Sequence, residues 1–292
     1  MTALFECSYG DERYFGFAPP TDRAGLRLYP GSGDELAAPI LESGGDIDAL
    51  TAGREPVDVP AGDRDKVRTR VPLFPDHVGD ALVSGFMKTH NVKVDAATPD
   101  QPNWFFKGLG EVLKLPGEPL SVPGEAVAVC EEAEVVLVYV GDAEDGRPRY
   151  VGYTFGNDVT DIGRFKRHNG HLSYAKLCDS AISPALHLGP PPSLVTGETV
   201  IERGGALVWK GPFTTGTSAL HYDLDTMMAT LFAHESLHWP GRVHYVYMGA
   251  DRSSFHGGHA MADGDRVTLD FRSHGIQLTN PLVRMPEPRP AA

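Results

Sequence analysis

The sequence predicts a β-rich α+β protein. Its 33 glycines and 24 prolines are spread along the whole chain of 292 residues. Short runs of β-branched and aromatic residues alternate with turn-forming residues, whereas long stretches with helical periodicity are rare. We therefore expect many short strands and few helices, arranged as one large domain or two modest ones.

The first hundred residues predict a small, irregular α+β domain. Strands are expected at residues 13–17 and 26–28, and a polar helix at 34–49. The turn-rich segment 96–103 precedes an aromatic run, which places a domain boundary near residue 100. The expected domains are therefore 1–100 and 101–288, followed by a frayed tail at 289–292.

The second part of the chain predicts mostly strands. A polar segment, residues 158–183, has no apolar periodicity and could form a mobile cover that orders on ligand binding. The best helix prediction is 226–238, whose methionines are expected in the core. Strands are expected at 127–140, 150–158, 243–248, 265–271 and 276–278, with a hairpin turn at 142–148.

Three acidic residues are expected at the ends of two strands. Glu132 and Glu134 precede the apolar run 135–140, and in an extended chain their side chains point to the same face. Asp158 ends the next β-prone run. Three carboxylates are the ligands that a hard divalent cation such as Mg²⁺ prefers. The pattern therefore predicts a magnesium-type site if the two strands meet.

The alternative is a solvated acidic face, which is the usual role of acidic residues on an alternating strand. Glu134, however, leads directly into a run that is expected to be buried. A carboxylate at the head of a buried strand needs a partner, and a metal ion is one such partner.

Composition excludes several classes of protein. The net charge is −13, with 39 acidic and 26 basic residues, which argues against nucleic acid or an anionic membrane as partner. Cys7, Cys130 and Cys178 show neither a disulfide framework nor zinc spacing, so a reducing cytoplasm is the expected location. No signal peptide or membrane-spanning stretch is expected.

Six motifs resemble, in order and spacing, those of the fumarylacetoacetate hydrolase superfamily. The resemblance is greatest to its sugar-acid branch, the 2-keto-3-deoxy-pentonate dehydratase-like proteins, and covers about residues 80–284. The motifs are NWFFKG at 103–108, EEAE at 131–134, GNDVTD at 156–161, AKL at 175–177, KGPFTTG at 210–216 and LTNPL at 278–282.

This resemblance implies a C-terminal roll of mixed β-sheets, a smaller irregular N-terminal domain and a homodimer. It also implies Mg²⁺ or Mn²⁺ held by Glu132, Glu134 and Asp158, the residues that the strand argument had already identified. The lysine of the family corresponds to Lys176, whose ammonium group could bind the carboxylate or enolate oxygen of a substrate.

The reactions of this superfamily start from a 2-oxo acid. The acid can chelate the cation, which then acts as a Lewis acid and lowers the cost of forming an enolate at C3. Attack of water on a distal carbonyl then gives carbon-carbon hydrolysis, whereas loss of a neighbouring hydroxyl gives dehydration. Tautomerisation and decarboxylation share the same enolate and remain open.

Two departures from the hydrolases favour dehydration. Hydrolytic relatives carry a histidine and a glutamate three residues apart that activate water, but here His90 is followed by Lys93 in the place of the acid. A cation there lowers the pKa of His90 and does not orient it as a carboxylate would. The Thr-Gly-Thr-Pro-like loop of the hydrolases also has no copy at 248–255, which reads MGADRSSF.

The sugar-acid branch usually places a glutamate in the cover segment. This chain has basic residues there instead, and His171 or His168 could serve as the acid or base, because histidine titrates near neutrality. Each could equally be a solvent-exposed loop residue without a role. The basic segment could also admit a substrate with more negative charge than a simple pentonate.

Several other residues near these motifs allow a functional or a structural interpretation. Lys107 could face the site or be a solvated lysine at a strand end. Thr214, Thr215 and Gly216 could bind the substrate carboxylate through hydroxyls and backbone amides, or form a plain turn. Cys178 has no assured base nearby and is expected to be a packing residue.

The function expected from the sequence is therefore a metal-dependent 2-keto-3-deoxy sugar-acid dehydratase. One alternative is a carbon-carbon bond hydrolase of the acylpyruvate or fumarylacetoacetate type. A second alternative is a homologue that binds metal or ligand and has lost the chemistry.

Overall fold

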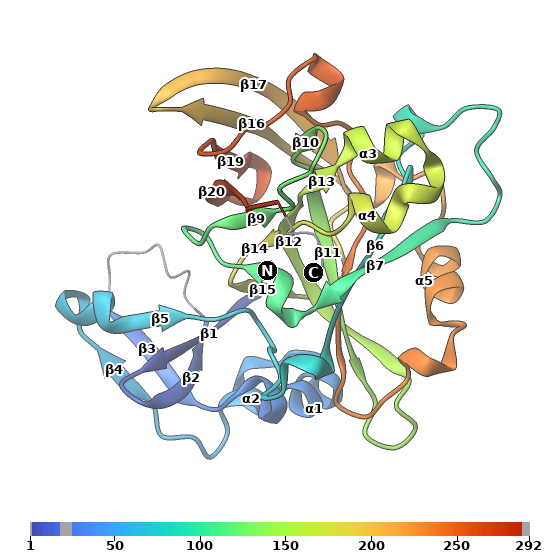
Figure 1. Ribbon diagram of the computed structural model, residues 1–292. Coiled ribbons are helices and arrows are strands. Elements are labelled where there is room, and N and C mark those ends of the chain that lie inside the picture. Colours follow the sequence, from blue (N-terminus) through green and yellow to red (C-terminus); the bar gives the residue numbers. More distant parts are fainter. Residues whose placement is uncertain (1, 18–24, 288–292) are drawn as a thin grey trace, which may run out of the picture.

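A large mixed sheet forms the centre of the molecule (Figure 1). The computed structural model describes residues 2–17 and 25–287, so the tail expected at 289–292 lies outside the described residues. Within them the sheet has 13 strands. In spatial order they are β4 (Val57–Val59), β3 (Leu26–Pro30), β2 (Glu12–Gly16), β1 (Thr2–Tyr9), β15 (Ala185–Leu188), β12 (Pro148–Asp158), β11 (Ala133–Gly141), β18 (Val243–Tyr247), β6 (Ala81–Met87) and β7 (Asn103–Leu109), with β5 (Val67–Thr69), β8 (Leu113–Lys114) and β14 (Ser180–Ile182) paired beside this path.

A second sheet packs against the first, and the expected β-rich α+β class is confirmed. Residues 195–215 form a long hairpin of this sheet that the sequence did not predict. Its strands are β17 (Ala206–Thr215), β16 (Val195–Arg203), β19 (Arg266–Phe271), β20 (Ile276–Arg284) and β9 (Leu120–Val122), and a separate pair is formed by β10 (Val129–Cys130) and β13 (Thr160–Asp161).

Helices are short in the described residues. The helix predicted at 34–49 is in fact two helices, because Gly44 adopts a left-handed conformation with φ of 65° and ends the first. The helix predicted at 226–238 ends early, and Met227 and Met228 are buried as expected. None of the described helices is long and apolar enough to cross a membrane. The α-helices are α1 (Gly33–Ser43), α2 (Ile47–Thr51), α3 (Ile162–Arg167), α4 (Leu172–Ala175) and α5 (Leu224–Phe232).

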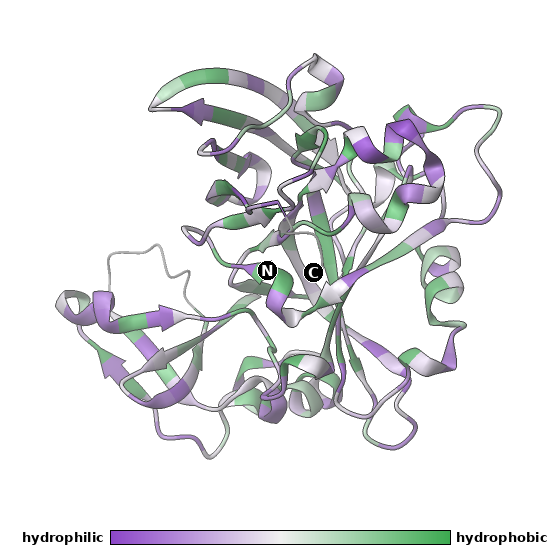
Figure 2. Ribbon diagram, viewed as in Figure 1, coloured by the Kyte–Doolittle hydropathy of each residue, from purple (hydrophilic) through white to green (hydrophobic). Residues whose placement is uncertain are grey.

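The packing of the core explains why the sequence of β11 is continuously apolar and does not alternate between polar and apolar residues. Val135 and Leu137 belong to the hydrophobic cluster between the two sheets, whereas Val136 and Val138 belong to a cluster on the other face that includes Leu36 of α1. A strand that is covered on both faces needs hydrophobic residues at successive positions. Figure 2 shows hydrophobic residues along the central strands and hydrophilic ones on the α3–α4 segment.

The hairpin predicted around 142–148 is confirmed. β11 and β12 pair in antiparallel register from Ala133 opposite Asn157 to Gly141 opposite Pro148. β11 also pairs with β18, which in turn runs parallel to β6. β6 precedes residue 100 and is nevertheless hydrogen-bonded within the central sheet, whereas β2 to β5 lie at its far end (Figure 1). The division of the chain into two domains stays a prediction.

The segment expected as a mobile cover contains packed short helices, and its ordering on ligand binding stays a prediction. Asp161 accepts a hydrogen bond from the backbone N–H of Arg164 and caps α3. Ile162 and Phe165 are buried in a cluster with Phe105 and Met87. The polar composition of 158–183 concealed this arrangement, because two apolar residues suffice to anchor helices of one or two turns.

Candidate metal centre

Three carboxylates converge at the ends of β11 and β12. Oxygen atoms of Glu132, Glu134 and Asp158 all lie within 4.8 Å of one another, and all three side chains are buried. The strand predicted at 127–140 is interrupted, so that Glu132 lies just before β11 rather than on it. Its position is held by the backbone N–H of Glu132, which donates to Oδ1 of Asn157 at 3.0 Å.

Two buried lysines face this acidic group. Nζ of Lys107, on β7, donates to Oδ1 of Asp158 at 2.6 Å and to the carbonyl of Val159 at 2.8 Å. Nζ of Lys176, just after α4, donates to Oε2 of Glu132 at 2.9 Å and to Oδ2 of Asp158. Lys107 is 4% exposed, so it is not the solvated strand-end lysine of the alternative interpretation, and Lys176 is 1% exposed.

Thr160 and Phe105 complete the surroundings of Lys176. The Thr160 hydroxyl lies 2.8 Å from Nζ of Lys176 and 3.0 Å from Oε2 of Glu132. The ammonium group also lies 4.3 Å from the centroid of the Phe105 ring, within range of a cation–π interaction. Thr160 was missed by the sequence reasoning although it lies inside the GNDVTD motif.

These contacts determine the protonation of the acids. Burial opposes ionisation of Glu132, but Lys176 and Lys93 outweigh burial and lower its pKa to about 2. Burial likewise opposes the charge of Lys176, yet Asp158 and Glu132 raise its pKa. The pKa of Glu134 is raised well above its usual value, first by burial and then by repulsion from Asp158 and Glu132.

The arrangement suits a divalent cation. Three oxygen donors within 4.8 Å of one another can form the protein half of a shell for a hard ion. Glu134, whose Oε2 accepts the backbone N–H of Gly249 at 2.5 Å, faces two like charges that a cation would offset. The donor set therefore fits the predicted ion.

His90 lies in a different environment from that of a water-activating histidine. It is 1% exposed, and its ring nitrogens lie 2.9 Å from Oγ1 of Thr215 and 3.1 Å from Oγ1 of Thr89. Burial, and then the charge of Lys93, lower the pKa of His90 to about 4. Nζ of Lys93 lies 3.5 Å from Oε1 of Glu132, so the residue in the place of the acid contacts a candidate metal ligand instead.

A cavity of about 290 Å³ opens beside Glu132. His256, which the sequence reasoning did not single out, lines this cavity, and its Nδ1 accepts the backbone N–H of Ser253 at 3.2 Å. The segment that carries it is tied to the centre by Glu131, whose carboxylate accepts the backbone N–H of Ser254 at 2.7 Å and its hydroxyl at 2.6 Å. Glu131 thus has a structural role beside the candidate metal ligands.

The remaining predicted residues lie outside this cavity lining. His171 is half-buried on the cover, with its ring 5.3 Å from that of His168. The backbone N–H of Thr214 donates to Asp251 at 3.0 Å, and Gly216 adopts a φ of 109°. Cys178 is 1% exposed, and burial raises its pKa to about 11, as expected of a packing residue.

Comparison with known proteins identifies the fold. Neither a family model nor a curated protein matches the chain. Among solved structures, the apo form of 2-keto-3-deoxy-D-arabinonate dehydratase matches with a TM-score of 0.69 and 16% identity, covering 98% of this chain and 100% of that one. The same enzyme complexed with magnesium and 2,5-dioxopentanoate matches with a TM-score of 0.66 and 17% identity over the same shares of both chains.

A second kind of enzyme shares the fold. The 2-hydroxyhepta-2,4-diene-1,7-dioate isomerase from Mycobacterium marinum matches with a TM-score of 0.63 and 19% identity, again over 98% of this chain and 100% of that one. The chain thus has the fold of the fumarylacetoacetate hydrolase superfamily, and the sequence resemblance is confirmed at that level.

Proposed function

We propose that this protein is a divalent-metal-dependent enzyme of the fumarylacetoacetate hydrolase superfamily that removes water from a 2-keto-3-deoxy sugar acid or a similar 2-oxo acid. The observation that carries the proposal is the buried group of Glu132, Glu134 and Asp158 opposite Lys107 and Lys176. Mg²⁺ or Mn²⁺ is the proposed cofactor, because both prefer oxygen ligands. The magnesium in the complexed dehydratase supports this choice.

A bound cation would supply Lewis-acid polarisation of the 2-oxo acid. Lys176 is the proposed partner of the carboxylate or developing enolate oxygen, because its ammonium group is held at the candidate metal centre by Glu132, Asp158 and Thr160. These three contacts use all three of its donors, so a substrate oxygen would replace one of them. Lys107 contributes indirectly, since it holds Asp158 in place. Thr214, Thr215 and Gly216 remain proposed contacts of the substrate.

Dehydration is favoured over carbon-carbon hydrolysis by the surroundings of His90. Both of its ring nitrogens are engaged by hydroxyls, and Lys93 replaces the carboxylate that would orient it. Departure of a hydroxyl group instead needs a proton donor. His171 remains a proposed acid or base, and His256 is added because it lines the cavity beside Glu132.

The test is product analysis by mass spectrometry. The magnesium-loaded protein and a Glu134→Ala control are incubated with 2-keto-3-deoxy sugar acids and with acylpyruvates. Metal-dependent loss of water supports the dehydratase, whereas cleavage into two acids that His90→Ala abolishes supports the hydrolase. Metal binding without turnover of either panel favours a non-catalytic homologue.

We further propose that the enzyme acts as a homodimer in the cytoplasm. The family resemblance supports the dimer, and the free thiols of Cys7, Cys130 and Cys178 suit a reducing compartment. Light scattering of the purified protein at several concentrations tests the dimer.

A further inference from the structure

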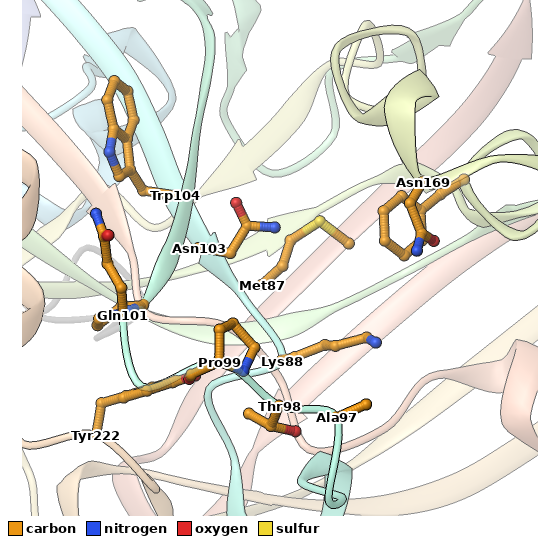
Figure 3. A pocket seen from close by; sticks show the side chains of 12 residues that line it. Met87, Lys88, Ala97, Thr98, Pro99, Gln101, Asn103, Trp104, Asn169 and Tyr222 are labelled. Carbon is orange, nitrogen blue, oxygen red and sulfur yellow. The ribbon is translucent and has the colours of Figure 1, made fainter.

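Two cavities meet beside the metal centre. The first, here called the metal-side cavity, contains Glu132 and has a volume of about 290 Å³. The second, the adjoining cavity, has a volume of about 480 Å³ and is shown in Figure 3. The two share Met87, Lys88 and Phe165 in their linings. A molecule bound at Glu132 that is longer than the first cavity would therefore extend past Lys88.

Lys88 lies at this junction in an uncommon backbone conformation. It directly follows β6 and has a φ of 54°, in the left-handed region that residues with a side chain rarely adopt. Figure 3 shows its side chain extended, with the ammonium group pointing away from the strand. Asn103 and Asn169 line the adjoining cavity and offer further hydrogen-bond donors.

A second cation comes from the cover. Lys166, in the last turn of α3, lines the metal-side cavity together with Lys88 and Lys93. Lys93 contacts Glu132, but no carboxylate of the described residues lies within 4.0 Å of the ammonium group of Lys88 or Lys166. Asp95, the other acid of the lining, accepts the backbone N–H of Ala97 at 2.9 Å.

The charges at the centre are already matched without these two lysines. The charges of the three carboxylates are offset in number by Lys93, Lys107 and Lys176, which contact Glu132 and Asp158 directly. A divalent cation would then be offset by the carboxylate and the enolate oxygen of a 2-oxo acid. The positive charges of Lys88 and Lys166 are therefore in excess, and the single negative charge of Asp95 offsets only one of them.

We propose, on the basis of the function proposed above, that Lys88 and Lys166 bind a second anionic group at the far end of the 2-oxo acid. The substrate class is therefore a 2-oxo acid with a distal carboxylate or phosphate rather than one with a neutral hydroxylated end. The metal centre holds the reacting end, and the junction of the two cavities selects the length and charge of the rest.

The test is a comparison of two ligands of equal chain length. Isothermal titration calorimetry of the full-length protein with Mg²⁺ measures binding of 2-oxoadipate, which ends in a carboxylate, and of 2-oxohexanoate, which ends in a methyl group. We expect 2-oxoadipate to bind about tenfold more tightly, as befits a charge-assisted contact in a half-open cavity. The preference should weaken at high salt.

Three variants locate the effect. Lys88→Asn removes the charge but keeps a residue that tolerates left-handed backbone, and Lys166→Gln removes the second charge. Each should reduce the preference to about threefold or less. Arg167→Gln is the matched control, because Arg167 is adjacent on α3 and lines neither cavity. It should leave the preference unchanged, and circular dichroism checks that all three variants fold.

The outcomes separate this inference from the proposed function. Magnesium-dependent binding of both ligands with equal affinity overturns the distal site and leaves the proposed function standing. Absence of magnesium-dependent binding of any 2-oxo acid overturns both. A preference that survives Lys88→Asn and Lys166→Gln also overturns the assignment to these lysines. The same affinity ratio can be measured for 2-keto-3-deoxygluconate 6-phosphate and its unphosphorylated form. If this ratio exceeds that of 2-oxoadipate to 2-oxohexanoate, the result supports phosphate as the distal group.

Discussion

Buried carboxylates occur both in the candidate metal centre and in the N-terminal strands, and Glu132 and Glu6 behave differently. Glu6 on β1 is 1% exposed, and no lysine of the described residues forms an ion pair with it. Burial raises the pKa of Glu6 to about 7, although it accepts the backbone N–H of Leu73 and lies 3.7 Å from a nitrogen of Arg13. Glu132 is also buried, and its pKa is lowered to about 2.

The difference shows what a metal site requires of a protein interior. Burial alone favours the neutral acid, which is a poor ligand for a cation. A buried ammonium group at 2.9 Å from Glu132 keeps the charged form of this residue stable. The fold thus uses buried carboxylates for two purposes, and the nearby cations decide between them.

Lys176→Met should have the largest effect. It removes the cation that contacts both Glu132 and Asp158, and breaking a buried ion pair costs about 3–5 kcal/mol of the free energy of unfolding. Turnover, once a substrate is known, should fall about a thousandfold, because a preorganised charge at the reacting end is lost. Denaturant unfolding and steady-state kinetics measure the two effects. Lys210→Met, at an exposed position of β17, is the control, and equal effects of both substitutions would contradict the assignment.

Glu134→Gln should stabilise the protein without metal and abolish the stabilisation that metal gives. In EDTA at pH 8 it should stabilise the protein by about 1–2 kcal/mol, because a buried charge repelled by Asp158 and Glu132 is replaced by a neutral amide. Its oxygen can still accept the N–H of Gly249. The rise in melting temperature that Mg²⁺ gives the unchanged protein should disappear. A magnesium-induced rise that persists in the variant would remove Glu134 from the ligand set.

Glu6→Gln should affect stability but not activity, and it shows the contrasting behaviour of the N-terminal strands. The folded pKa of about 7 exceeds the ordinary value of 4.5, so the folded state binds this proton more tightly than the unfolded state does. Stability is therefore lost as the pH rises from about 4.5 through 7. The variant should lack this loss and be about 1–3 kcal/mol more stable than the unchanged protein at pH 8. Thermal unfolding from pH 5 to 8 measures this pH dependence of stability. Glu42→Gln, at an exposed position of α1, is the control. Parallel curves for Glu6→Gln and the unchanged protein would contradict it.

Much of the fold could be read from local patterns. The strands at 13–17, 26–28, 243–248 and 265–271, and the hairpin at 142–148, follow from alternation and turn residues and are confirmed within a residue or two at most boundaries. The short helices within the cover at 158–183 and the hairpin at 195–215 were not predicted. In the cover, two buried residues anchor short helices, and the burial pattern of the hairpin alternates too irregularly to reveal a strand.

The sequence by itself predicted that Glu132, Glu134 and Asp158 come together, because they lie at or next to the ends of two strands joined by a hairpin, and the pairing of a hairpin is local. Only the tertiary structure decided which cations meet them. Lys107 and Lys176 come from separate segments, and Lys88 and Lys166 meet at the cavity only because β6 and α3 pack beside the same sheet end. Contacts between distant segments depend on how whole layers pack, which no local pattern encodes.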